Sequence, residues 1–173
     1  MKRGKAKHVA LLGMLFALAM VLSVLEGLVT PLLGLPPGVK PGLSNIVVMY
    51  ALFFLGGANA LTLAVLKAFF AALTRGAMAG ALSLAGGLAS LAVMLALRLL
   101  WRDSSWFILS VSGAVAHNFG QLMIIRLLLT QSVYTLYYAP VLLLSGLVMG
   151  AVTSVSLRAL LPALERLGLS KNN

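Results

Sequence analysis

Few residues of this chain could do chemistry, and most of them lie within or beside long apolar stretches of the sequence. An ionisable side chain in the hydrocarbon of a membrane costs about 2.5–3.5 kcal/mol on insertion scales unless it is paired or hydrated. Each such residue therefore requires an explanation, and ligand binding would account for several of them together. The candidate substrate-binding residues are Lys40, Asn45, Lys67, His117, Gln121, Glu26, Arg75 and Arg126.

These candidates share one depth once each apolar stretch is given a direction across the membrane. Glu26 lies at the end of the first stretch, Asn45 begins the second at the same face, and Lys67 lies in the outer half of the third. We therefore predict a cavity open to the outside. Its basic lining residues are Lys67, Arg75, Arg126 and Lys40. Because one acid faces several bases there, an anionic or polar small molecule is the favoured ligand.

The same residues have simpler explanations that the sequence leaves open. Arg75 and Arg126 could extend to lipid head groups, since long basic side chains do so near helix ends. The loop residue Lys40 could be solvated. Glu26 could pair with Lys67 and neutralise both charges.

Helix geometry limits which residues near position 120 can line one narrow cavity. His117 and Gln121 are four residues apart and share a helix face. Asn118 is offset from His117 by about 100°, and Arg126 by about 180°. His117 and Gln121 are therefore the better pair, although a neutral core histidine bonded to a neighbouring helix is an equally good explanation of His117.

The sequence lacks the residue sets that common catalytic sites need. The acids are Glu26, Asp103 and Glu165, and the last two are expected far from the first. Paired carboxylates and aspartate-rich magnesium motifs are therefore absent. There is no cysteine, there are two histidines, and no phosphate-binding loop with Lys-Ser/Thr is present. We expect no enzymatic activity, no metal and no cofactor.

The composition predicts an integral membrane protein. Of the 173 residues, 61% are hydrophobic and 9% charged, whereas soluble domains carry roughly 25% charged residues. Long apolar runs indicate an all-α bundle of about six transmembrane helices in a single domain, 1–173. The predicted spans are 8–29, 43–55, 58–74, 78–100, 106–130 and 137–161.

The distribution of Lys and Arg predicts the orientation of this bundle. With both termini in the cytoplasm, nine basic residues lie at the inner face, against Lys40 and Arg75 in outer loops. The nine are Lys2, Arg3, Lys5, Lys7, Arg98, Arg102, Arg158, Arg166 and Lys171. The net charge of +10 therefore reflects membrane topology and contact with lipid, and no nucleic-acid partner is expected.

Small residues on the first span could form a docking surface. Ala10, Gly13 and Ala17 share one helix face, and such stripes let membrane helices approach closely. Internal packing and an external membrane partner explain this stripe about equally well.

Four segments resemble a known family of small bacterial membrane proteins. They are KPGLSN at 40–45, LK at 66–67, SLAGG at 83–87 and HNFGQ at 117–121. The chain resembles heptaprenyl diphosphate synthase component I, also called the Gx transporter family, over most of its length. That family is similar to the substrate-binding S components of energy-coupling factor (ECF) transporters.

The resemblance implies a role in the bacterial cytoplasmic membrane. It implies an S component that captures a small molecule from the outer face and docks through the first helix. The partners would be a transmembrane coupling subunit and two ATPase subunits. The alternatives are a non-catalytic accessory subunit of heptaprenyl diphosphate synthesis and a scaffolding membrane protein. The sequence does not identify the ligand.

Overall fold

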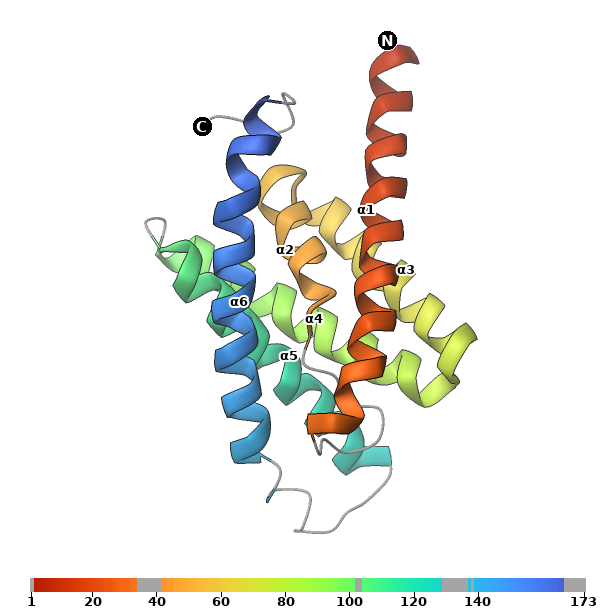
Figure 1. Ribbon diagram of the computed structural model, residues 1–173, viewed down its shortest axis with the longest axis vertical. Helices are drawn as coiled ribbons and strands as arrows, with labels where there is room; N and C mark the ends of the chain where they lie inside the picture. The colour runs from red at the N-terminus through yellow and green to blue at the C-terminus, as the bar shows by residue number, and fades with distance from the viewer. Residues whose placement is uncertain (1, 34–41, 102–103, 129–136, 138, 167–173) are drawn as a thin grey trace.

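The computed structural model describes residues 2–33, 42–101, 104–128, 137 and 139–166, and it is helical throughout most of this part of the chain (Figure 1). The helices are α1 (Lys2–Val29), α2 (Asn45–Phe54), α3 (Gly57–Arg75), α4 (Ala77–Leu100), α5 (Trp106–Leu128) and α6 (Ala139–Arg166), and a short 3-10 helix, η1 (Thr30–Leu33), follows α1. The predicted all-α bundle is confirmed. The helices begin and end within a few residues of the predicted spans, with two exceptions. α1 begins at Lys2 rather than at residue 8, and α6 ends at Arg166 rather than at residue 161.

Five of these helices are long and apolar enough to cross a membrane, and α2 is not. With ten residues, α2 is about 15 Å long, half of the roughly 30 Å of hydrocarbon. A short helix is tolerated at membrane depth when protein surrounds it. Residues 47–52 of α2 are all buried, between α1, α3, α4 and α6.

Glycines set the two tight turns on either side of α3. Gly56 has φ +95° and Gly76 has φ +91°, a backbone region that side chains with a Cβ rarely adopt. Gly76 alone separates α3 from α4, and Leu55 and Gly56 separate α2 from α3. The sharp reversals place α2, α3 and α4 side by side in the order of the sequence.

The most extensive contacts in the bundle are those of α4 with α3 and α5, and of α5 with α6. Glycines on these helices allow the close approach. A Cβ added to Gly80 would lie 2.6 Å from Cβ of Ala72, and one added to Gly150 would lie 2.5 Å from Cα of Val111. Close packing of this kind, rather than burial of apolar surface, holds membrane helices together.

Successive helices run in opposite directions, so α1 begins and α6 ends at the same end of the bundle (Figure 1). Two hydrogen bonds tie helix ends together there. His8 bonds Asn59 at 3.1 Å, and Arg98 donates to the Leu52 carbonyl at 3.5 Å. We call this the terminal end, and the opposite one, where α1 ends and α2 begins, the pocket end.

The outer faces of the helices are covered with exposed large hydrophobic side chains, including Met14 and Leu28 on α1, Phe69 on α3 and Val155 on α6. A water-soluble protein does not expose apolar surface on this scale. Together with the five long apolar helices, this surface identifies the chain as a multi-pass membrane protein.

Candidate functional site

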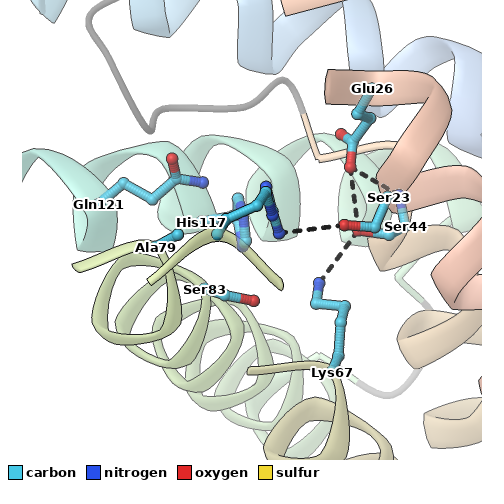
Figure 2. A pocket seen from close by; sticks show the side chains of 9 residues that line it. Ser23, Glu26, Ser44, Lys67, Ala79, Ser83, His117 and Gln121 are labelled. Carbon is cyan, nitrogen blue, oxygen red and sulfur yellow. Dashed lines mark hydrogen bonds between the residues drawn. The ribbon is translucent and has the colours of Figure 1, made fainter. Parts of the chain in front are cut away.

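Polar side chains from four helices and from the segment before α2 converge on a pocket at the pocket end (Figure 2). The pocket has a volume of about 20 Å³, which is enough for about one water molecule. The described residues that line it are Ser23, Glu26, Ser44, Lys67, Arg75, Ala79, Ser83, His117 and Gln121. Five of the eight predicted site residues are among them.

The carboxylate of Glu26 holds the segment that leads into α2. One oxygen accepts the backbone N–H groups of Gly42 and Leu43, and the other accepts the N–H and hydroxyl of Ser44 at 3.4 and 3.0 Å. Backbone N–H groups before a helix have no partner within the helix, and they favour an anion. Glu26 is 1% exposed. Its carboxylate thus fixes the entrance of α2 against the end of α1.

Lys67 reaches the same cluster from α3. Its ammonium group donates to the hydroxyl of Ser44 at 3.3 Å and to the side-chain oxygen of Asn45. Figure 2 shows the lysine pointing toward Ser44 across the pocket. The hydroxyl of Ser44 contacts both charged groups and so bridges Glu26 and Lys67.

Arg75 turns into the pocket from the end of α3. Its guanidinium donates to the hydroxyl of Ser23 at 3.2 Å, one helical turn before Glu26 on α1. Part of the side chain remains exposed. The structure therefore places Arg75 at the pocket rather than extended away from it toward lipid head groups.

His117 occupies a slot between two glycines. A Cβ added to Gly86 of α4 would lie 2.7 Å from the imidazole ring, and one added to Gly42 would lie 3.4 Å from it. The ring is 3% exposed. Gln121, one turn further along α5, also lines the pocket, as the helix geometry predicted. Asn118 points elsewhere and donates to the Leu142 carbonyl of α6 at 2.8 Å.

Three of the predicted site residues have other positions. Asn45 is buried beside the pocket and orients Lys67 without lining the cavity. Arg126 is exposed near the end of α5 and is not among the residues that line the pocket, because it faces away from His117. Lys40 lies outside the described residues.

Four lining residues were not among the predicted ones. They are Ser23, Ser44, Ala79 and Ser83. Serine and alanine are common in membrane helices, so their residue types carry little signal. Their spacing from predicted site residues is a better signal. Ser23 precedes Glu26 by three residues on the same helix face, and Ser44 directly precedes Asn45.

The charges of the pocket favour an anion. Lys67 and Arg75 contribute two positive groups, whereas the negative charge of Glu26 is already hydrogen-bonded to backbone donors. Within the described ranges, no group of three His, Cys, Asp or Glu side chains could hold a metal ion. The pocket is therefore a set of hydrogen-bond donors and hydroxyl groups suited to binding a polar or anionic molecule.

The small-residue stripe of α1 lies on the outside of the bundle. Ala10, Gly13 and Ala17 are all exposed. A Cβ added to Gly13 would meet nothing within 4 Å. Within the part of the chain that is described, the stripe is therefore not used for internal packing.

Comparison with known proteins gives one match. The sequence profile of a family described as heptaprenyl diphosphate synthase component I matches residues 15–160. This range contains every described residue that lines the pocket. Neither a search of curated proteins nor a search of solved structures found a significant match.

Proposed function

Because the chain belongs to the heptaprenyl diphosphate synthase component I family, as its motifs predict, we propose that it is the ligand-capturing membrane subunit of a larger assembly. The polar pocket binds a small polar or anionic molecule. The observation that carries this proposal is the convergence of Lys67, Arg75, His117 and Gln121 on one pocket of a membrane bundle. Residues that only join helices need not gather in this way.

The form of assembly that we propose is an ECF-type uptake system, with this chain as its S component. The bundle lies in the bacterial cytoplasmic membrane with both termini inside, so the pocket opens outward. Three observations support the proposal. The pocket lies at the end of the bundle opposite the chain termini, and the basic residues Lys7, Arg98 and Arg158 lie toward the terminal end. The small-residue stripe of α1 is exposed. A membrane coupling subunit docks on that stripe, and two ATPases supply the energy.

The experiment that tests this proposal is purification of the tagged protein in a mild detergent, with identification of every chain that accompanies it. Recovery of a membrane coupling protein together with two ATPases is the expected result. Gly13→Leu should abolish this recovery, because a side chain at Gly13 fills the proposed interface and meets nothing within its own bundle. Ala92→Leu, on an exposed face of α4, is the matched control and should leave recovery intact.

The family description favours a second candidate function. The chain could be a non-catalytic accessory subunit that holds a soluble prenyltransferase at the membrane during heptaprenyl diphosphate synthesis. The same purification separates the two proposals. Recovery of a prenyltransferase without ATPases, unaffected by Gly13→Leu, would reject the transport role and support the accessory one.

A further inference from the structure

The lining of the pocket is almost entirely polar. Among the described residues that line it, Ala79 is the one whose side chain lacks a polar group. The others offer hydroxyl groups, an amide, an imidazole, a carboxylate and two cationic groups. Sites for drug-sized organic ligands are instead lined mainly by hydrophobic and aromatic side chains. This lining suits a ligand with polar atoms on every side.

Two of the helix interfaces beside the pocket leave no room for an apolar chain. Between α3 and α4, a Cβ added to Gly80 would lie 2.6 Å from Cβ of Ala72. Between α4 and α5, one added to Gly120 would lie 2.7 Å from the Ala85 carbonyl oxygen. Helices this close leave no groove between them for a hydrocarbon chain.

The floor of the pocket is closed as well. One turn deeper than Asn45 and Lys67, the bundle is filled by a cluster of buried apolar side chains from α2, α3 and α4. The cluster includes Val47, Val48, Leu63, Ala64 and Leu91, each at most 4% exposed.

We propose that this pocket recognises a compact phosphate or diphosphate group by itself and makes no contact with a prenyl chain. Lys67 and Arg75 supply the positive charge, and the hydroxyl group of Ser83 supplies a further donor. The inference rests on the proposed function of the pocket as a ligand site. It assigns the ligand class by the anionic group and excludes the isoprenoid tail that the family description suggests.

The test is a series of diphosphates with increasing chain length, titrated by calorimetry against the full chain in lipid nanodiscs. The probes are inorganic pyrophosphate, dimethylallyl diphosphate and geranyl diphosphate, and empty nanodiscs correct for partition into lipid. Each buried methylene contributes about fourfold in affinity, so a chain held in the pocket would raise affinity by more than a hundredfold per isoprene unit. We expect the three dissociation constants to agree within about threefold, or the prenyl compounds to bind more weakly.

Affinity that rises tenfold or more from pyrophosphate to geranyl diphosphate would overturn the inference, and so would failure of all three probes to bind. Lys67→Met should weaken pyrophosphate binding at least tenfold, whereas Lys7→Met, at the exposed start of α1, should not change it. Recovery of coupling proteins in the purification described above does not depend on these results. Failure of this inference can therefore be distinguished from failure of the proposed function.

Discussion

Ser44 joins the acid of the pocket to its buried lysine. Its hydroxyl donates to Glu26 at 3.0 Å and accepts from Lys67 at 3.3 Å. The chain from Glu26 through Ser44 to Lys67 connects α1, the entrance of α2 and α3. In a medium of low polarity such a connected network is worth more than its bonds taken singly, and it fixes the position of each member. The two charged residues therefore have different roles.

Glu26 is expected to contribute to stability more than to ligand affinity. Glu26→Gln keeps the size of the side chain but replaces the charged acceptor of the Gly42 and Leu43 N–H groups. Hydrogen bonds to charged groups contribute about 1.5–3 kcal/mol. We expect a clear fall in the melting temperature of the protein in detergent. An unchanged melting temperature together with lost ligand binding would show that Glu26 belongs to the binding set instead.

Lys67 is expected to show the opposite pattern. Lys67→Met preserves the length of the buried side chain and removes the positive charge that faces the pocket. Ligand binding should weaken at least tenfold while the bundle stays folded, as measured by titration and by gel filtration of the same sample. A variant that aggregates or elutes as unfolded protein would contradict this separation of roles.

At the scale of the helices, Gly86 of α4 determines how closely α4 approaches α5 at His117. In Gly86→Ala, the new methyl group would lie 2.7 Å from the imidazole and 2.9 Å from the His117 carbonyl oxygen. Overpacking of this kind costs about 1–3 kcal/mol. The matched control is Gly13→Ala on α1, which meets nothing within 4 Å. Thermal unfolding should show a loss of stability for Gly86→Ala and no loss for Gly13→Ala. Equal effects would contradict the close packing of His117 against Gly86.

The helices themselves were largely predictable, because the length of an apolar run and a glycine at its end are local properties of the sequence. Gly56 and Gly76 marked both ends of α3 in this way. The depth of Glu26, Lys67 and His117 could likewise be inferred from their distance to the helix ends. Rotation about a helix axis could be inferred only within one helix, and His117 and Gln121 do line the same pocket.

Contacts between helices were not predictable from the same patterns. The bridge through Ser44 depends on how the backbone turns before α2, and the turn of Arg75 toward Ser23 depends on the packing of α3 against α1. Arg126 has the same residue type and a similar place near a helix end, yet it faces outward. Residue type and depth did not separate the two arginines, whereas the direction around the helix did.

At the scale of the whole molecule, the orientation in the membrane can be tested directly because the chain has no cysteine. Thr74→Cys is exposed at the pocket end, and Lys7→Cys is exposed at the terminal end. With the proposed orientation, a membrane-impermeant maleimide should label Thr74→Cys in intact cells and Lys7→Cys only after permeabilisation. The reverse pattern would place the pocket inside the cell and remove the proposed route of ligand capture.

The contact between Glu26 and residues 42–44 also bears on how the chain enters the bilayer during synthesis. The donors that satisfy the carboxylate are made 16 to 18 residues after it. Until they emerge from the ribosome, α1 carries an unpaired acid that is unfavourable in hydrocarbon. In an insertion assay, a reporter fused after residue 33 should therefore show less complete insertion than one fused after residue 56, and Glu26→Leu should remove the difference. A single acid would thus make the first two helices integrate as a hairpin, which sets the order of biogenesis for the rest of the bundle.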